Sequence, residues 1–585
     1  MKIPTCFGEI ILFVISFLLG SSNSQSSEIN WDWWRTAVIY QIYPKSFNDA
    51  NNDGYGDLRG IISKLPHLAD AGVNAAWISP IYASPQVDDG YDISNFVDVW
   101  ETFGTLEDFD ELVTASHELD IKIIMDLVPN HSSDQHDWFK LSENRTTGYE
   151  DYYVWRDGES STTPPNNWIS VFKYSAWKYS EIRRQWYLHQ FTEQQPDLNY
   201  RNPKVLEEMT NVIKFWLDRG VDGFRVDAIP HMYEDEQFRD EPLSGYEGVQ
   251  AFEYDYLIHN CTKDLNETYQ VIYYWREVLD NYTQNKGGDA RIMMVESSSA
   301  LPMTMLYYTD GSRNGAHFPF NFQLFGISEG SSASDIINVV NNWLNNMPRG
   351  DYVPNWELGN HDQIRAATRF GKDNIDAFNM LNLLLPGVAV TYNGEEIGME
   401  NGEVTWQEGQ DPSACNGDEE SFNTTSRDFA RTPYHWDNST NAGFNIGAET
   451  WLPVSRKYLE CNLENQRTTD RNSHYKVYKK LTALRKESPF RRGNFEMAAV
   501  ADYVMAFTRI SNRSDGIVVV LNTGSSSATV NLTGHFPNLT SQLEVLVSSI
   551  TSERIEGDTV ITSSIGLWWL WITMLPILFF FLFLT

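Results

Sequence analysis

The sequence predicts an α/β protein built on a (β/α)8 TIM barrel, and three observations support that prediction. A chain of 585 residues is long enough for such a barrel and smaller domains. Amphipathic stretches with helical spacing alternate with short apolar segments, notably over residues 106–119 and 205–217. Several of the apolar segments are apolar throughout, as parallel strands buried on both faces are. The eight predicted strands are residues 37–43, 75–79, 121–127, 223–228, 292–296, 316–322, 355–359 and 388–392.

Two segments do not follow this alternation. Residues 132–195 come after the third predicted strand and are rich in Ser, Thr, Pro, Asn, Trp and Tyr, and they are too long for a plain loop. We expect an inserted small domain there. Residues 490–555 carry short alternating runs that predict a C-terminal antiparallel β domain. The catalytic barrel then consists of residues 25–131 and 196–489.

The first 24 residues are typical of a secretory signal peptide. Lys2 supplies the basic start, residues 10–20 are apolar, and residues 22–24 offer small side chains for cleavage. The folded part is therefore expected outside the cell.

The other end of the chain is almost wholly apolar from residue 567 to residue 584, with no basic stop after it. A polar spacer and small residues precede it, so residues 556–585 resemble a GPI-attachment signal. An uncleaved tail anchor, a secreted form and a buried core helix are the alternatives. With either anchor, the protein lies on the extracellular face of the plasma membrane, held there through its C-terminus.

Glycosylation sequons and sparse cysteines fit that compartment. Asn130 also matches the sequon but lies in a candidate site, and we expect it to stay unmodified. After removal of the signal, a Cys415–Cys461 bridge that leaves Cys261 unpaired is one arrangement, but the sequence does not fix the pairing. The other sequons are at Asn144, Asn260, Asn266, Asn281, Asn423, Asn438, Asn512, Asn531 and Asn538.

Composition narrows the class of ligand. Forty-four Lys and Arg against 79 Asp and Glu give a net charge of −35, which argues against a nucleic-acid partner. Aromatic residues make up 14% of the chain. They either fill the core or stack on the flat faces of sugars.

Polar side chains gather where four of the predicted strands end, which is the catalytic edge of such a barrel. One carboxylate there would usually be a solvated loop residue or a helix cap, but four such strand ends are hard to explain that way. The strand ends carry Asp126 with Asn130 and His131, then Arg225 with Asp227, then Glu296, then Asn360, His361 and Asp362.

Arg225 and Asp227 are two residues apart on a strand, so their side chains share a face. The guanidinium favours an ionised Asp227, which is what a nucleophile needs. Glu296 ends the next strand and can approach Asp227. One ionised and one protonated carboxyl form the machinery of glycoside hydrolysis. The alternative is a buried Arg–Asp ion pair that serves only the fold.

These motifs identify the chain as similar to glycoside hydrolase family 13, the α-amylase family, and within it to the oligo-1,6-glucosidase and maltase group. The resemblance covers roughly residues 30–550. It rests on DLVPNH (126–131), QPDLN (195–199), GFRVDAIPH (223–231), VES (295–297) and NHD (360–362). The signal, the sequons and the tail make the chain most similar to insect membrane-bound maltases.

The resemblance assigns roles to matching residues. Asp227 is the expected nucleophile, Glu296 the acid/base, and Asp362 the residue that holds sugar hydroxyls and stabilises the transition state. The segment DDGYDIS places Asp88 and Tyr91 at the non-reducing glucose. The remaining expected contacts are His131, Arg225 and His361 at the cleaved bond, and Arg431, which is expected to pair with Asp88 and close the pocket.

The activity that the resemblance implies is that of a retaining, exo-acting α-glucosidase (maltase). It would cleave maltose, sucrose and short malto-oligosaccharides without a redox cofactor or a catalytic metal. The small Ala228 after the nucleophile favours α-1,4 over α-1,6 linkages, unless it merely packs beneath the strand end. The alternatives are transglycosylation, such as sucrose isomerisation, and a binding or receptor role for a protein ligand. A protein that only binds is expected to have lost Asp227 or Glu296, and both are present. The sequence does not reveal the oligomeric state.

An acidic loop near the first strand has the pattern of a calcium site. It places oxygen-bearing residues at loop positions 1, 3, 5 and 9, a backbone carbonyl at 7 and Gly54 at 6. Position 12 is Gly60, so the bidentate Glu of an EF-hand is missing. A solvated acidic turn is the alternative, whereas the family resemblance implies structural Ca²⁺. The predicted ligands are Asp49, Asn51, Asp53, Tyr55 and Asp57.

Overall fold

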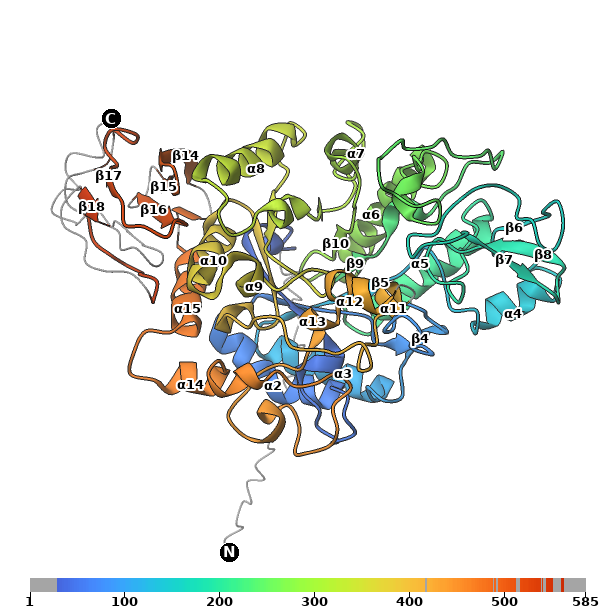
Figure 1. Cartoon of the computed structure of the whole chain (residues 1–585), viewed down its shortest axis with the longest axis horizontal. Coiled ribbons are helices and arrows are strands. Elements are labelled where there is room, and N and C mark those ends of the chain that lie inside the picture. Colours follow the sequence, from blue (N-terminus) through green and yellow to red (C-terminus); the bar gives the residue numbers. More distant parts are fainter. Residues whose placement is uncertain are drawn as a thin grey trace, which may run out of the picture.

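A nearly closed barrel of eight parallel strands forms the centre of the protein (Figure 1). The structure is a computed structural model that describes residues 29–415, 418–487, 489–490, 493–511, 516–537, 539, 543–550 and 559–561. Each predicted strand segment contains one observed barrel strand. These strands are β1 (Val38–Ile42), β2 (Ala75–Ile78), β5 (Lys122–Leu127), β9 (Gly223–Val226), β10 (Ile292–Val295), β11 (Phe318–Pro319), β12 (Asn355–Glu357) and β13 (Val388–Tyr392).

The barrel is joined at its open seam by side chains. The strand order runs β11-β10-β9-β5-β2-β1-β13-β12, so β11 and β12 are the two ends of the sheet. Asn355 of β12 donates from its side-chain amide to the Pro319 carbonyl of β11 at 2.6 Å. Its amide oxygen accepts from the Asn321 backbone N–H at 2.9 Å. These bonds take the place of a backbone ladder and hold the catalytic edge in a ring.

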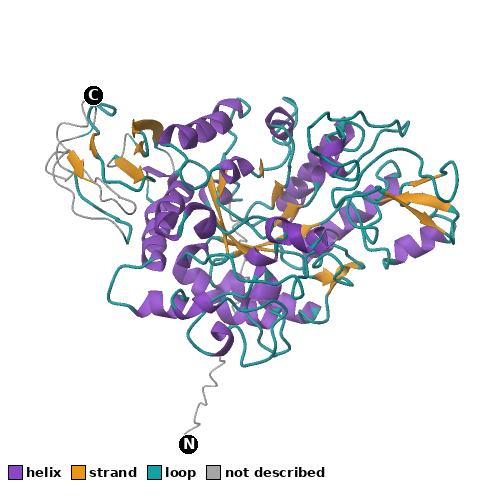
Figure 2. Ribbon diagram, viewed as in Figure 1, coloured by secondary structure: helices purple, strands orange, loops and turns teal. Residues whose placement is uncertain are grey.

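Helices surround the strands (Figure 2). Several of these helices begin at a residue whose side chain caps the first turn. Thr105 and Asp108 form a capping box at α3, and Asn202 caps α5. The expected helices over 106–119 and 205–217 are α3 and α5. The helices are α1 (Pro44–Phe47), α2 (Leu58–Ala71), α3 (Leu106–Glu118), α4 (Asp137–Glu143), α5 (Pro203–Asp218), α6 (Asn266–Lys286), α7 (Leu301–Leu306), α8 (Ala333–Asn346), α9 (Ala366–Phe370), α10 (Ile375–Leu384), α11 (Pro412–Cys415), α12 (Glu419–Thr425), α13 (Asp428–Arg431), α14 (Leu463–Thr468) and α15 (His474–Arg485).

A small antiparallel sheet lies within the predicted insertion. Its strands are β6 (Trp155–Arg156), β7 (Trp177–Ser180) and β8 (Gln185–Leu188), in the order β6-β8-β7. Figure 1 shows this sheet beside the barrel, at the right of the view. A second short pair, β3 (Tyr82–Ala83) and β4 (Asn95–Val99), lies on the loop after β2.

The C-terminal part is antiparallel, as expected. Strands β14 (Asn494–Ala501), β15 (Val504–Ile510) and β16 (Ile517–Asn522) form one sheet, and β17 (Thr529–Asn531) pairs with β18 (Thr559–Ile561). The alternation of β15 divides its side chains between two cores. Met505 and Phe507 join the barrel core, whereas Val504 and Ala506 face a separate small core.

The predicted signal peptide and the apolar tail from residue 567 lie outside the described residues. Within the described part of the chain, no helix is long and apolar enough to cross a membrane.

The Cys415–Cys461 bridge is not formed. Cys461 is a free thiol, and its Sγ lies 3.2 Å from the Ile397 carbonyl. Cys261 is also free and is buried. The side chain of Cys415 lies outside the described part.

Candidate active site

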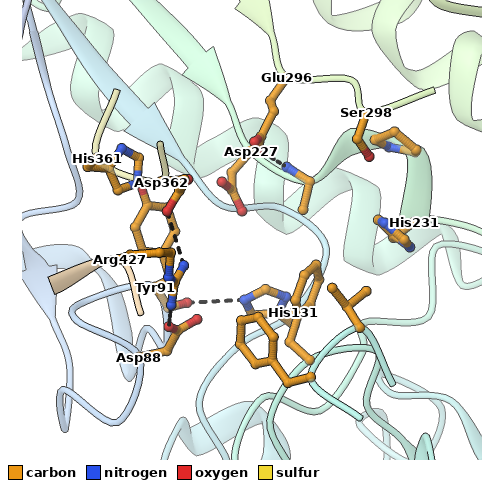
Figure 3. A pocket seen from close by; sticks show the side chains of 15 residues that line it. Asp88, Tyr91, His131, Asp227, His231, Glu296, Ser298, His361, Asp362 and Arg427 are labelled. Atoms are coloured by element: carbon orange, nitrogen blue, oxygen red, sulfur yellow. Dashed lines mark hydrogen bonds and ion pairs between the residues drawn. The ribbon is translucent and has the colours of Figure 1, made fainter. Parts of the chain in front are cut away.

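One guanidinium holds three carboxylates at the catalytic edge of the barrel. Arg225 Nη1 donates to Asp126 at 2.9 Å and to Asp227, and Nη2 lies 3.0 Å from Glu296. Figure 3 shows the side chains of Asp227 and Glu296 close together in the pocket. The register explains this convergence, because Asp126 of β5 and Met294 of β10 flank Arg225 of β9. Asp227 and Glu296 follow these strands directly. The sequence prediction of a paired carboxylate site is therefore matched by the geometry.

Burial raises the pKa of two carboxyls in this cluster. Burial raises the pKa of Asp227; Arg225 opposes the rise, and Glu296 and Asp126 add to it. Burial also raises the pKa of Asp126, to about 6, against the effect of Arg225. Because three carboxyls face one cation, the fully ionised cluster is disfavoured.

Ala228, between the two carboxyl groups, has an unusual backbone. Its φ is 47° and its ψ is 30°, a left-handed conformation that few alanines adopt. In this conformation the Ala228 N–H points at Glu296 and donates to Oε2 at 3.1 Å. Strained backbone is often found at functional sites, where surrounding contacts hold it in place.

His361 is a neutral imidazole of defined tautomer. Gln41 donates to its Nδ1 at 2.7 Å, so the proton lies on Nε2. Nε2 is 2.8 Å from the Tyr91 hydroxyl and 3.3 Å from Asp362. Burial lowers the pKa of His361 to about 3, and the Tyr91 ring stacks on the imidazole with centroids 5.6 Å apart. Tyr91 in turn donates to Asp126 at 3.1 Å.

Asp362 is held ionised at the same site. Burial alone would raise its pKa, but the guanidinium groups of Arg427, Arg431 and Arg225 together lower it well below the ordinary value. Arg427 and Arg431 both donate to Asp362 Oδ1, at 3.1 and 2.8 Å.

The structure corrects the predicted Arg431–Asp88 pair. Arg431 pairs instead with Asp89 at 2.6 Å, and its side chain is fully buried. The guanidinium beside Asp88 belongs to Arg427, at 3.2 Å. The physical reason lies in helix α13. Arg427 is the N-cap residue just before this helix and lines the cavity, whereas Arg431 is the last residue of the helix and does not line it. The two residues are four apart, so their side chains lie on one face about one turn apart along the helix axis and reach different carboxylates.

His131 lies on the opposite side of Asp88 from Arg427. The amide nitrogen of Gln195 donates to Asp88 at 3.0 Å and lies 3.1 Å from His131 Nε2. Burial lowers the pKa of His131 to about 4, so the ring is neutral. Gln195 was missed as a contact, although the QPDLN motif that contains it had been singled out.

These residues surround a cavity of about 200 Å³. Seven predicted site residues line it, whereas Arg225 and Arg431 lie behind the lining side chains. The sequence reasoning missed Arg427 and Ser298 as lining residues. It also missed Pro230 and His231, which lie in the quoted motif GFRVDAIPH, and three residues of the insertion, namely Val171, Phe172 and Phe191. The lining is Asp88, Tyr91, His131, Val171, Phe172, Phe191, Asp227, Ala228, Pro230, His231, Glu296, Ser298, His361, Asp362 and Arg427.

A family model for the α-amylase catalytic domain matches residues 41–493, which include every residue of this cavity. The chain belongs to the α-amylase family. It is a glycoside hydrolase.

Members of the family with names and solved structures resemble the chain over nearly its whole length. It is 45% identical to Maltase A1 of Drosophila melanogaster, over 90% of this chain and 93% of that protein. It is 44% identical to an α-glucosidase of Apis mellifera, over 88% and 89%. The solved structure of XgtA, an α-glucosyl transfer enzyme, superposes with a TM-score of 0.82 at 33% identity, covering 92% of this chain and 99% of that chain.

The acidic loop is a tight turn in which backbone N–H groups occupy the predicted ligand oxygens. Asp49 accepts from the N–H groups of Asn52 and Gly54, at 2.6 and 2.8 Å. Asp57 accepts from Ala50 and Gly60, at 2.9 and 2.6 Å. Within the described residues, no group of three or more His, Cys, Asp and Glu side chains is arranged to hold a metal ion.

Proposed function

We propose that the protein is an α-glucosidase that removes terminal non-reducing α-1,4-linked glucose from maltose, sucrose and short malto-oligosaccharides. One observation carries the proposal. Asp227 and Glu296 share the Arg225 guanidinium at one wall of a small cavity whose other wall is the Arg427-linked pair of Asp88 and Asp362. Such a pair gives a terminal glucose a set of charged hydrogen-bonding groups beside the cleavage machinery.

In the proposed reaction Asp227 attacks as the nucleophile and Glu296 acts as the acid, with the Arg225 guanidinium in contact with both. An Asp227 oxygen forms a bond to the anomeric carbon while the glycosidic C–O bond breaks. Glu296 gives its proton to the leaving oxygen. Water then adds to the anomeric carbon, the Asp227 ester bond breaks, and the water proton returns to Glu296. Two inversions retain the configuration.

The separation of the carboxyls supports retention. Retaining enzymes place the two carboxyl groups about 5 Å apart, whereas inverting enzymes keep about 6.5–9.5 Å free for a water molecule. Here both carboxylates contact one planar guanidinium. Asp362, Tyr91 and the neutral His361 supply hydrogen bonds to the bound ring.

Transfer of glucose to another sugar is the second candidate function, because the solved relative XgtA is a glucosyl transfer enzyme. The two reactions share every catalytic residue and differ in whether water or a sugar enters second. A receptor role without catalysis is less favoured, because it gives no reason for the intact Asp227, Glu296 and Asp362 cluster.

The experiment is product analysis with maltose, sucrose, isomaltose and starch as substrates. The proposal expects glucose from maltose and sucrose, released first as the α-anomer, and little product from starch. Accumulation of isomerised disaccharides from sucrose would favour transfer. Absence of product from every substrate would leave a binding role.

We also propose that the protein is a glycoprotein held by a C-terminal lipid anchor on the outer face of the plasma membrane. The support is the polar spacer followed by the apolar tail and the placement of the sequons. Among the described residues, seven sequon asparagines have exposed side chains, whereas Asn130 is buried. The exposed ones are Asn144, Asn260, Asn266, Asn281, Asn423, Asn438 and Asn531.

A structural Ca²⁺ in the loop of residues 49–57 is a further proposal, and it rests on the sequence pattern. Asp53 and Asp57 keep lone pairs beyond those that accept N–H groups, and these could bind a hard cation. Each Asp49 oxygen already accepts two N–H groups, so Asp49 would have to give up such a bond to bind the ion. The ion would have no catalytic step. A melting temperature that falls on addition of EGTA and recovers with Ca²⁺ would support the proposal, and an unchanged one would favour the solvated turn.

A further inference from the structure

We infer that Tyr174 and Phe252 form a stacking platform for the outer sugar residues of malto-oligosaccharides, an inference that rests on the proposed α-glucosidase function. Both side chains are exposed, 56% and 40% respectively. Their rings stack with centroids 5.3 Å apart and planes 19° apart. An exposed, ordered aromatic pair is a surface on which the apolar face of a pyranose ring can lie.

The platform is continuous with the catalytic cavity. Tyr174 follows Phe172, which lines the cavity together with Val171. Their α-carbons are at most about 7.6 Å apart, because successive α-carbons are about 3.8 Å apart. Tyr174 therefore lies at the rim beside the aromatic wall that Phe172 and Phe191 form, with centroids 5.6 Å apart. A chain whose terminal glucose is bound inside must leave past this rim.

The turn that presents Tyr174 is strained. Lys173 and Tyr174 have φ values of 72° and 65°, so two successive residues with side chains adopt the left-handed region. The turn is held by bonds from Lys173 N–H to the Ser170 carbonyl at 3.0 Å and from Ser170 N–H to the Tyr174 carbonyl at 2.9 Å. Strain held by surrounding contacts points to a function for the displayed side chain.

Phe252 comes from a different part of the chain, the long loop between β9 and α6. Tyr174 N–H donates to the Phe252 carbonyl at 2.7 Å, which joins the two segments at the stack. Figure 1 shows this loop and the inserted sheet on the same side of the barrel. The platform therefore exists only in the folded protein.

Buried contacts keep the two segments in fixed positions. Trp168 is 1% exposed, stacks on Phe238 at 5.5 Å and donates to the Arg239 carbonyl at 2.9 Å. Asn167 and Glu241 exchange two hydrogen bonds of 2.8 Å. A rigid platform loses little conformational entropy when a sugar binds, so it adds affinity rather than only area.

We assign a sugar chain rather than a protein as the occupant, because Tyr174 of the pair follows closely in sequence on the lining residues Val171 and Phe172 of the cavity. The terminal glucose would bind in the cavity, and the platform would contact the glucose units that follow the second unit of the chain. It therefore makes the enzyme prefer longer malto-oligosaccharides over maltose, and Tyr174 and Phe252 determine that specificity.

The test compares kcat/KM for maltotetraose with kcat/KM for maltose in wild type, Tyr174→Ala, Phe252→Ala and the double variant. The ratio is expected to fall about 2- to 12-fold in each single variant, through KM. The double variant should lose little more, because the two rings act as one stack. Tyr174→Phe should keep the ratio, and so should Tyr274→Ala, a matched control on α6 with 42% exposure.

Three results separate the outcomes. The inference is overturned if the ratio of kcat/KM for maltotetraose to that for maltose stays within twofold of wild type in both alanine variants. That result is expected if the two rings bind a protein partner instead of a sugar chain. Equal losses on both substrates overturn it too, because they indicate a structural role. If wild type releases no glucose from maltose or maltotetraose, the proposed function itself is wrong, whereas an active wild type with unchanged ratios leaves that function standing.

Discussion

Arg427 contacts Asp88 at 3.2 Å and Asp362 at 3.1 Å, so one guanidinium joins two carboxylates that lie 274 positions apart in the sequence. A third carboxylate, Asp411, lies 2.6 Å from the same group. Arg427 thereby fixes the wall of the cavity that faces Asp227 and Glu296.

Substitution of this arginine tests the correction to the predicted pairing. Arg427→Ala should raise KM for maltose and lower kcat/KM at least about tenfold, because Asp88 and Asp362 lose their shared donor. Arg431→Ala should also lower activity, because Arg431 donates to Asp362, but in addition it should destabilise the fold by about 3–5 kcal/mol, because it leaves Asp89 buried beside Lys45 without its second partner. Steady-state kinetics and urea unfolding of both variants give the comparison. The reverse pattern would restore Arg431 as the cavity residue.

The catalytic roles of the two carboxyls can be tested at constant volume. Asp227→Asn and Glu296→Gln should each lower kcat by at least about 10³-fold, because they remove the nucleophile and the acid. Asp227→Asn should be as stable as wild type or more so, since it removes one of three carboxylates that crowd Arg225. Substantial glucose release by a folded Asp227→Asn protein would contradict the assignment.

The small side chain after the nucleophile should set linkage preference. Ala228→Val should shift the ratio of kcat/KM from maltose towards isomaltose, because the residue lines the cavity beside the cleaved bond. A change of one or two methyl groups in a pocket corresponds to about 10–200-fold in specificity. The variant should also melt at a lower temperature, because a β-branched residue fits poorly at a φ of 47°.

Ala228→Gly is the matched control for that substitution, since glycine adopts positive φ readily. It should keep the preference for maltose and lose no stability through backbone strain. An unchanged maltose-to-isomaltose ratio in Ala228→Val would show that Ala228 serves packing alone.

Glu357 should make stability depend on pH. It is fully buried on β12, and burial raises its pKa from 4.5 to about 8, against the effects of Asn360 and Arg225. The folded state therefore binds this proton more tightly than the unfolded state. The contribution of Glu357 to the free energy of unfolding is fully present below pH 4.5. It decreases by up to about 1.4 kcal/mol per pH unit as the pH rises towards 8.

Glu357→Gln should remove that slope, so its stability relative to wild type should increase from pH 5 to pH 8. Urea unfolding at pH 5, 6.5 and 8 measures the difference. Glu118→Gln, at an exposed position, is the control and should show no such trend. A difference between Glu357→Gln and wild type that is constant with pH would contradict the prediction.

The proposed lipid anchor predicts release by a phospholipase. Phosphatidylinositol-specific phospholipase C should shed the enzyme from intact cells, and the mature protein should lack residues 567–585. Mock-treated cells are the control. A tryptic peptide from the mature protein that contains residues 568–571 would argue for an uncleaved tail.

Local pattern alone was enough to predict the barrel and its catalytic centre. Each strand segment was recognisable because parallel strands are buried on both faces, and Arg225 and Asp227 had to share a face because they are two residues apart. The closeness of Glu296 to Asp227 was predictable because Glu296 lies at the end of the next strand of the barrel. These features depend on the immediate chain and on the fixed geometry of a barrel.

The tertiary structure alone decided which distant groups meet. Arg427 precedes the short helix α13 and Arg431 ends it, and only the placement of this helix against the cavity shows that Arg427 reaches Asp88 while Arg431 reaches Asp89. The left-handed backbone of Ala228 and the stack of Tyr174 on Phe252 likewise depend on segments folded against each other. The physical reason is that ion pairs and ring stacks are set by positions in space to within an ångström or so, whereas sequence spacing fixes direction only along one helix or strand.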